Sequence, residues 1–535
     1  VGLLFTIAAT VQAALWAQGL LLPLVERRSR PETDPTGNIS SAYGVLRVLV
    51  TAVVWALAGI ILLDNLGVNV TALVAGLGVG GPTGEQVVQG AVAVTRPDAN
   101  TTTVTQSSNG AVVNWHSFSV GGQEYVQFVQ PGANAAILNR VTGGNASQIL
   151  GRIDANGRVF LVNPQGVYFG AGAKVDTAGF AASTLDINDD DFMQGRYVFT
   201  KGTGAPDASV TNAGELTGDQ FVVLMGDRVA NEGLVQARLG TVALAAGQKV
   251  SLQLGDSGLV SFAVDEATVA AHAGVENTGE IVANGGRVLM TAKVANDLVA
   301  TAVNNAGVVR AVGIEEDGGG IFLRGSGAKV VNSGTLDASG ANGGRVLVTS
   351  TTDDVEIAAG AVVKATGDAT GQGGTVRLVA HDTLDVAAGA TVDARGGDKG
   401  GRIEVSAHQG LLELDGDIKA GAGGEVVVDP ARLAIDAGTG APSGNSTLAT
   451  VGKGFIETQL NNNTDVTLVA ADEIFATGGP FTIAASGTGD LALRIGQITG
   501  STSASLGVGL STGTFSVGPE AGGNINLAGI SINIQ

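Results

Sequence analysis

The sequence contains no cysteine, and aromatic residues make up only 4% of its 535 residues. The lack of cysteine excludes disulfide bonds, thiol chemistry and cysteine-ligated structural zinc. No serine, histidine and carboxylate grouping stands out, so the sequence predicts no enzyme, no cofactor and no metal site. The histidines are few and stand at no metal-ligand spacing: His116, His272, His381 and His408.

Basic residues are also scarce, at 29 Lys and Arg against 49 Asp and Glu, which gives a formal charge of −20. Residues 1–81 carry four charges of each sign, so the whole excess falls on residues 82–535. Such an acidic surface disfavours nucleic acid as a partner. The 83 glycines follow no strict G-X-Y period, so the chain is neither collagen-like nor ordinarily globular. This length and composition favour several domains or one elongated repeat array.

Long apolar runs occur only before residue 82. Residues 1–24 ("VGLLFTIAATVQAALWAQGLLLPL") carry no charge, and a second run covers 48–63. Both are long enough to predict transmembrane helices, with residues 70–81 as a possible third, and they assign membrane contact to residues 1–63. The arginines between the first two runs predict a cytoplasmic loop: Arg27, Arg28, Arg30 and Arg47.

The segment "LDNLGVNVTALVAGLGVGG" (63–81) resembles the start of the pore-lining helix of small-conductance mechanosensitive channels. That resemblance implies close helix packing at small residues: Ala72, Ala75, Gly76, Gly78, Gly80 and Gly81. The remainder of a pore helix is replaced by "PTGEQVV" from Pro82 onward. Three interpretations stay open: a plain helical anchor, a channel protein with an appended domain, and a chimeric gene fusion at Pro82.

After Pro82 the sequence consists of short β-branched runs broken by glycine and asparagine. Double glycines precede apolar strands at spacings of 34, 24, 30, 27 and 23 residues: Gly285, Gly319, Gly343, Gly373, Gly400 and Gly423. Asn-x-Gly turns alternate with short strands: Asn212, Asn231, Asn277, Asn305 and Asn332. Because Asn and Gly tolerate left-handed backbone conformations, we expect sharp corners there. The pattern predicts a β-solenoid with Val, Leu, Ile and Ala facing inward, and a β-sandwich array is the alternative.

Four stretches carry a more specific resemblance: "PTGEQVVQG" (82–90), "VVNWHSFSVGG" (112–122), "VQFVQPGANAAILNRVTGGNASQILGRI" (126–153) and "GRVFLVNPQGVYFGAGAKVDTAGFAASTLDI" (157–187). Together they resemble the amino-terminal secretion domain of filamentous haemagglutinin-like exoproteins, the passengers of two-partner secretion. The later stretch "GGEVVVDPARLAID" (423–436) resembles the repeat region of the same family.

The resemblance implies an all-β fold, a right-handed parallel β-helix, and the apolar runs place two or three transmembrane helices before it. It also implies recognition by an outer-membrane β-barrel transporter, and a secreted or cell-surface location in a Gram-negative bacterium. We expect an adhesin or haemagglutinin fragment, with a host-cell surface as a possible partner. An inner-membrane tether is possible if the first segment is genuine. The expected divisions are 1–81 for the helices, 82–205 for the secretion domain, 206–436 for the repeats and 437–535 for a less regular, truncated continuation.

The candidate recognition motif is Asn163-Pro164-Gln165-Gly166-Val167, which matches the family's second Asn-Pro motif with Gln165 in place of the usual Asn. The residues themselves predict an Asx-type turn at Asn163 and a positive φ at Gly166. Such a turn would stabilise a corner, and it could also contact the transporter. The resemblance further assigns a framework role to Asn114, Trp115, Asn139 and Arg140. For the acidic run "DINDDD" (186–191) we expect a solvated turn rather than a calcium site.

Overall fold

The computed structural model describes Thr51 and residues 80–238, 240–256, 258–272, 274–295, 299–313, 319–441, 443–445, 448–470, 473–476, 481–497, 506–510, 515–524 and 532–534. The chain divides into two units, Val1–Val79 and Gly80–Gln535. Almost all of the predicted transmembrane and channel-like segment lies outside the described residues. Within the described ranges, no helix is both long and apolar enough to cross a membrane.

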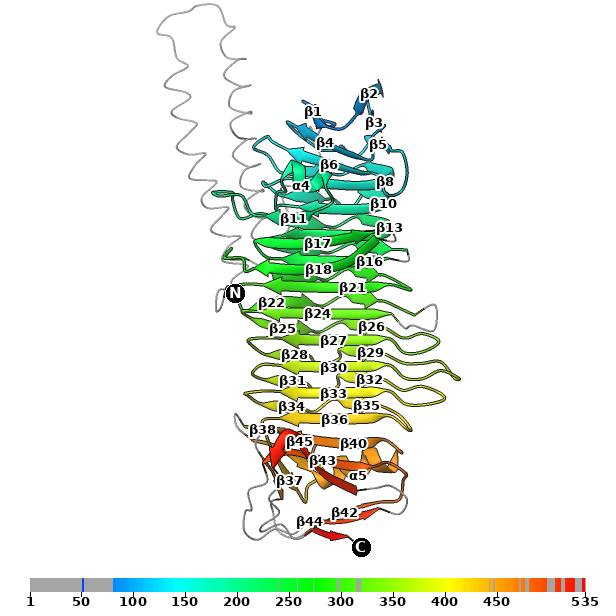
Figure 1. Ribbon diagram of the computed structural model, residues 1–535, viewed down its shortest axis with the longest axis vertical. Helices are drawn as coiled ribbons and strands as arrows, with labels where there is room; N and C mark the ends of the chain where they lie inside the picture. Colours follow the sequence, from blue (N-terminus) through cyan, green and yellow to red (C-terminus); the bar gives the residue numbers. More distant parts are fainter. Residues whose placement is uncertain are drawn as a thin grey trace, which may run out of the picture. The chain divides into compact units, whose positions relative to one another are not determined.

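From residue 80 onward, successive coils of chain stack on one another, and each typical coil contributes three strands. Each strand pairs in parallel with the corresponding strand of the next coil (Figure 1). The first strands form one ten-stranded sheet: β7 (Ser147–Ile149), β9 (Val167–Phe169), β12 (Ser209–Asn212), β14 (Arg228–Asn231), β19 (Gly274–Asn277), β22 (Thr301–Asn305), β25 (Lys329–Asn332), β28 (Val355–Ile357), β31 (Leu384–Val386) and β34 (Leu412–Leu414). Parallel stacking of this kind is a β-solenoid, so the β-sandwich alternative is wrong.

The second and third strands of each coil belong to the large sheet. The second strands are β15 (Leu234–Ala237), β20 (Glu280–Val282), β23 (Val308–Arg310), β26 (Thr335–Asp337), β29 (Val362–Lys364), β32 (Thr391–Asp393) and β35 (Asp417–Lys419). The third strands are β16 (Thr241–Ala246), β21 (Arg287–Lys293), β24 (Gly320–Ser326), β27 (Arg345–Ser350), β30 (Thr375–Ala380), β33 (Arg402–Ala407), β36 (Glu425–Pro430), β40 (Asp465–Ala470), β43 (Leu491–Gln497) and β45 (Phe515–Asn524).

Earlier coils join the second and third positions into long strands: β8 (Arg152–Val162), β10 (Lys174–Ser183) and β13 (Glu215–Gly226). The first coils contain β3 (Thr101–Gln106), β4 (Gly110–Trp115), β5 (Tyr125–Val129) and β6 (Ala136–Val141). Two antiparallel strands close this end of the stack, with β1 (Gln86–Gln89) on β4 and β2 (Val92–Asp98) on β3. A sheet edge that would otherwise be open is thereby occupied.

Beyond β36 the chain adds smaller sheets and a helix. A four-stranded sheet contains β37 (Arg432–Asp436), β38 (Ser443–Asn445), β39 (Leu448–Gly452) and β41 (Glu473–Ala476). A three-stranded sheet contains β42 (Phe481–Ala485), β44 (Leu506–Leu510) and β46 (Ile532–Ile534). The nine-residue helix α5 (Lys453–Asn461) lies between β39 and β40. The division at residue 437 stays a prediction.

The inward side chains of the coils between Val104 and Leu493 merge into one apolar cluster. At one inward position of the third strands, Val288, Ile321 and Val346 stack in register and are fully buried. The predicted inward set of Val, Leu, Ile and Ala is confirmed. Burial of each such side chain favours folding by about 1.5–3 kcal/mol, but only when the neighbouring coil covers it.

The five predicted Asn-x-Gly corners are built differently from the expectation. Their asparagines end first strands with their side chains in the core, exposed by at most 1%. The Nδ2 of each of the first four donates to the Oδ1 of the asparagine in the next coil at 2.7–2.8 Å, so the ladder runs from Asn212 to Asn332. None of the five has a positive φ, which Asn463 alone shows among the described non-glycine residues. The expected left-handed conformation is therefore wrong, and a ladder of buried amides holds these corners.

A second apolar layer lies outside the large sheet. The strands β11 (Tyr197–Thr200), β17 (Lys249–Gly255) and β18 (Gly258–Glu266) form an antiparallel sheet, here called the covering sheet. It packs on outward side chains of the long strands, among them Phe160, Phe221 and Met225. Phe160 stacks on Tyr197 with their ring centroids 5.3 Å apart. This layer had no counterpart in the sequence expectation.

Carboxylates stack on the outer face of the ten-stranded sheet. Glu356, Asp385 and Glu413 occupy equivalent positions of β28, β31 and β34. Burial raises the pKa of Asp385, and the charges of Glu413, Glu356 and Asp415 raise it further. Ionised Asp385 therefore opposes folding, whereas protonated Asp385 does not.

We expect Asn277→Ala to lower the free energy of unfolding by about 2–4 kcal/mol. The Oδ1 of Asn305 would lose its amide partner inside the core, and the Nδ2 of Asn231 would keep only its 3.3 Å bonds to the carbonyl oxygens of Gly233 and Glu280. The measurement is urea unfolding followed by circular dichroism. Asn304→Ala is the matched control, because Asn304 is the half-buried neighbour on the same strand. Equal effects of the two substitutions would show that the ladder contributes nothing specific.

We expect Asp385→Asn to stabilise the protein at neutral pH by less than about 1 kcal/mol, since the site is partly exposed. The raised pKa of Asp385 means that the folded state binds this proton more tightly than the unfolded state. The advantage of the variant should therefore shrink as the pH falls from neutral through the raised pKa toward the unfolded value of about 3.9. Urea unfolding of the wild type and the variant, from neutral pH down to a pH near the pKa of Asp in the unfolded chain, measures the difference in stability. A constant difference across that range would contradict the electrostatic explanation.

Candidate functional site

The corner after β8 contains the candidate recognition motif, and Asn163 organises it. The side chain of Asn163 is fully buried. Its Oδ1 accepts a hydrogen bond from the backbone N–H of Gln165 at 2.9 Å. Its Nδ2 donates to the carbonyl oxygen of Asn145 and to the Oγ of Ser147, both at 3.0 Å. The predicted Asx-type turn is thus present, and the amide also ties the corner to the preceding coil.

The other motif residues differ in exposure. Gly166 has a φ of 116°, as predicted, and its N–H donates to the carbonyl oxygen of Asn163 at 3.0 Å. Val167 begins β9 and is buried, whereas Pro164 is half-buried and Gln165 is exposed. In the folded protein, a partner at this corner therefore meets chiefly Pro164 and Gln165.

Two of the predicted framework residues contact each other in the core. The indole N–H of Trp115 donates to the Oδ1 of Asn139 at 3.0 Å, and the Nδ2 of Asn139 donates to the carbonyl oxygen of Phe160 at 3.3 Å. Both side chains are fully buried. The ring of Trp115 meets that of Phe118 edge to face at 5.4 Å. Trp115 and Asn139 therefore stabilise the first coils and present no side chain to a partner.

The other two framework residues lie on the outer face. Arg140 donates from Nε to Asp186 at 2.8 Å and from Nη1 to Asp189 at 2.5 Å. It also contacts Asn114 and donates to the carbonyl oxygen of Ile187. Burial would lower the pKa of Arg140, but the carboxylates of Asp186 and Asp189 outweigh it and raise that pKa. The guanidinium of Arg140 thus holds the acidic segment 186–189 against the outer face of β6.

The acidic run is partly helical. The short helix α4 (Asp189–Met193) begins after Asn188, whose side chain accepts the N–H groups of Asp190 and Asp191. Two of the aspartates neutralise Arg140, which sequence reasoning missed because Arg140 and Asp186 are 46 residues apart. Over the ranges that the structure describes, no group of three or more His, Asp or Glu could hold a metal ion.

The framework and the corner lie side by side. In the parallel pairing of β6 with β8, Arg140 stands opposite Val162, the residue before Asn163. The N–H of Asn163 donates to the carbonyl oxygen of Ser183 at 2.9 Å, at the end of β10. The chain then runs on to Asp186. One outer edge of the first coils thus brings together the corner with half-buried Pro164 and exposed Gln165 and the acidic segment that Arg140 holds.

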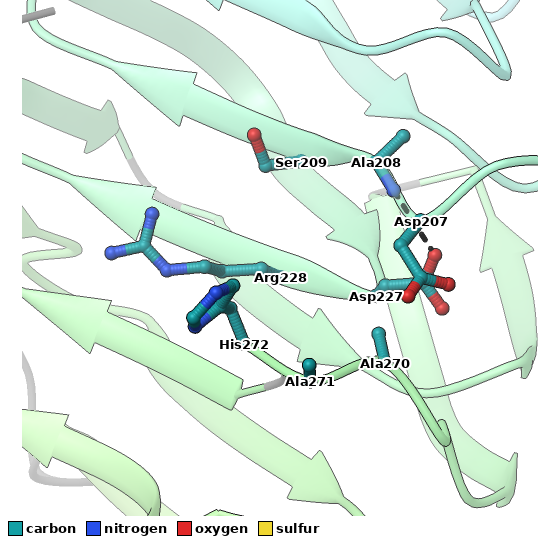
Figure 2. A pocket seen from close by; sticks show the side chains of 8 residues that line it. All are labelled: Asp207, Ala208, Ser209, Asp227, Arg228, Ala270, Ala271 and His272. Carbon is teal, nitrogen blue, oxygen red and sulfur yellow. Dashed lines mark hydrogen bonds between the residues drawn. The ribbon is translucent and has the colours of Figure 1, made fainter. Parts of the chain in front are cut away.

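A separate cavity of about 420 Å³ lies between β12, β14 and the segment before β19 (Figure 2). Arg228 and His272 lie together at one end, and Asp207 and Asp227 at the other. Asp227 is buried, pairs with Lys201 at 2.8 Å and accepts from the hydroxyl of Thr268 at 2.7 Å. Arg228 pairs with Glu276 at 2.6 Å. These carboxylates and the guanidinium are thus paired within the protein, and the apolar lining consists of alanines.

The TPS secretion domain family matches residues 80–338. Two curated relatives, both called "Heme/hemopexin-binding protein" and both from Haemophilus influenzae, are 37% identical over 212 residues and 31% identical over 278 residues. These alignments cover 38% and 48% of this chain but only 23% and 29% of the relatives. The crystal structure of the HMW1 secretion domain from Haemophilus influenzae covers 85% of this chain and all of its own, at 22% identity and a TM-score of 0.49.

The relatives are therefore much longer than the part that the chain matches, and their names describe whole proteins. The family match, by contrast, includes every residue of the corner and of the framework described above. Residues 80–338 of this chain thus match the TPS secretion domain family, which supports a relation to two-partner secretion exoproteins.

Proposed function

We propose that this protein is a two-partner secretion passenger of the adhesin or haemagglutinin type. Its secretion domain is recognised by a dedicated outer-membrane β-barrel transporter, which exports the chain to the cell surface or the medium of a Gram-negative bacterium. The observation that carries the proposal is the TPS match over residues 80–338. The absence of cysteine agrees with it, because no disulfide would block passage of an unfolded chain.

The Asn163 corner is the proposed recognition element. In the folded domain, Pro164 and Gln165 are the accessible members of the motif, while Asn163 fixes the backbone that presents them. Arg140 acts as a positioning residue, because it holds the acidic segment beside this corner. A transporter that reads the folded corner would contact Gln165, whereas one that reads an unfolded chain could also contact Asn163.

The domain limits form part of the proposal: secretion domain at 82–205, repeats at 206–436 and a less regular continuation from 437. We propose a right-handed coil, the sense that parallel strand connections overwhelmingly adopt. The role of residues 1–81 as an anchor, channel segment or fusion partner stays a prediction.

The names of the two relatives favour a second candidate function, the binding of heme or hemopexin. Secretion domains are shared by passengers with different activities, so this candidate concerns the whole protein rather than its first coils. Titration of the full chain with hemin, followed by absorbance, and with hemopexin, followed by calorimetry, separates the two. Saturable binding of either ligand would favour the second candidate over an adhesin.

We expect Gln165→Ala to lower secretion through the transporter without changing the midpoint of urea unfolding, because its side chain is exposed. Asn163→Ala should lower both secretion and the midpoint of urea unfolding, with a loss of about 2–3 kcal/mol in the free energy of unfolding. The measurements are the amount of passenger in the medium and urea unfolding of the purified variants. Normal secretion of Gln165→Ala beside reduced secretion of Asn163→Ala would mean that the transporter does not read the exposed Gln165, and that the corner acts through its stability or through Asn163 in an unfolded chain.

A further inference from the structure

The cavity of Figure 2 lies where the chain returns twice from the covering sheet to the coil stack. Segment 201–208 leads from β11 back to β12, and the segment after β18 leads back to β19. Both return segments line the cavity, together with residues on or beside β12 and β14. Its volume of about 420 Å³ is large enough for a small molecule.

The aspartate end of the cavity holds more negative than positive charge. The Nζ of Lys201 pairs with Asp207 at 2.7 Å and with Asp227 at 2.8 Å, so one ammonium meets two carboxylates and one negative charge is left over. Asp227 is buried and also accepts from the hydroxyl of Thr268 and the N–H of Ala208. Asp207 is exposed and meets Lys201 through Oδ1. Among the described residues its Oδ2 has no donor, so Asp207 can accept a hydrogen bond from a ligand.

The opposite end of the cavity presents hydrogen-bond donors. Arg228 pairs with Glu276 through Nη2 at 2.6 Å. Within the part of the chain that the structure describes, its Nε and Nη1 have no acceptor, and the imidazole of His272 and the hydroxyl of Ser209 have no partner. Ser209 stands opposite Arg228 in the pairing of β12 with β14, and His272 lies beside the guanidinium (Figure 2). A guanidinium with unused N–H groups is well suited to bind a carboxylate.

The wall between the two ends contains Ala270 and Ala271 (Figure 2). Their methyl groups form no hydrogen bonds, so this part of the cavity fits a compact group with small side chains. Asp227 and Arg228 are adjacent in the sequence, yet their charged groups lie at opposite ends of the cavity. The length of an arginine side chain therefore separates the two ends, whereas the ammonium and carboxylate of one amino acid share a single carbon atom. The cavity thus fits a ligand longer than one amino acid.

We propose that this cavity binds a short peptide by its free amino and carboxyl termini. The carboxylate accepts hydrogen bonds from Arg228, His272 and Ser209 at one end. The ammonium donates to Asp207 at the other end, where it compensates the negative charge that Lys201 leaves. The inference goes beyond the proposed function, because it concerns the folded coils and involves no transporter.

A sugar acid would offer the same carboxylate, with hydroxyl groups in place of the ammonium. The negative charge at the aspartate end favours the ammonium, because opposite charges attract whereas a hydroxyl carries no net charge. We therefore assign the cavity to peptides, and tighter binding of a sugar acid is the result that would reassign it.

The test is calorimetric titration of the full 535-residue chain with L-alanyl-L-alanine, for which we expect saturable binding. Acetylation of the amino terminus of this peptide removes the ammonium, and amidation of its carboxyl terminus removes the carboxylate. Each blocked peptide should bind at least about tenfold more weakly, because it lacks one charge-assisted contact. Galacturonate serves as the sugar acid and should bind more weakly than the unblocked peptide.

Arg228→Gln and Asp207→Asn should each raise the dissociation constant of the peptide at least about tenfold. Arg310→Gln is the matched control, because Arg310 also pairs with a glutamate of the neighbouring coil but does not line the cavity. Ala271→Phe should abolish binding, since the ring fills the cavity and leaves every charge in place. Ala271 is exposed, so its replacement does not disturb the core.

Circular dichroism first establishes that each variant melts like the wild type. Absence of saturable binding to the wild-type chain, equal binding of the blocked peptides, or tighter binding of galacturonate would each overturn the inference. Unchanged binding by Arg228→Gln, Asp207→Asn and Ala271→Phe would place the peptide elsewhere and overturn it as well. These variants should be secreted like the wild type, so the proposed function is tested separately.

Discussion

Everything in this fold depends on the fixed distance between one coil and the next. A single coil has an inward face but cannot cover it, so each coil is stable only against its neighbours. Equivalent positions of successive coils therefore face the same spacing and the same surroundings, and they carry the same kind of side chain. Valine and isoleucine fill one inward position of the third strands, and asparagines end several of the first strands. Even the glycines follow this rule. A Cβ at Gly233, Gly279, Gly307 or Gly334 would lie 2.0–2.2 Å from a carbonyl oxygen of the preceding coil.

This constraint explains which parts of the fold could be predicted from the sequence. The inward pattern repeats along the chain, so it shows in the spacing of strands and double glycines. The turn at Asn163 was also predictable, because its hydrogen bond to the N–H of Gln165 joins residues two apart. Interactions between coils were not predictable. Asn231 and Asn277 are 46 residues apart, as are Arg140 and Asp186, and Trp115 and Asn139 are 24 apart. Composition alone indicated corners at the asparagines, but not that their amides enter the core in place of a left-handed backbone.

The candidate site shows the same division between local and distant interactions. Asn163 defines the motif, and its side chain forms hydrogen bonds only within the corner and to the preceding coil. A motif of this kind marks a position where the chain must turn in one way, and the exposed residue beside it is free to meet a partner. Trp115 and Asn139 repeat the pattern, since they are buried while Asn114 and Arg140 beside them face outward. Buried and outward-facing side chains thus alternate along the strand with the period of two that β-structure imposes.

The distribution of large side chains separates the first coils from the rest. The largest fully buried side chains, one tryptophan and seven phenylalanines, all lie between Trp115 and Phe221. Aromatic side chains bury more area than valine or leucine, and these coils also contain the long strands and the covering sheet. In an array with nearest-neighbour coupling, folding begins where the interfaces are strongest and spreads to weaker coils. The later coils, with Val, Leu, Ile and Ala inward, gain most of their stability by adding to a coil that is already folded. The region that matches the secretion domain therefore has the physical properties of a template for the rest of the stack.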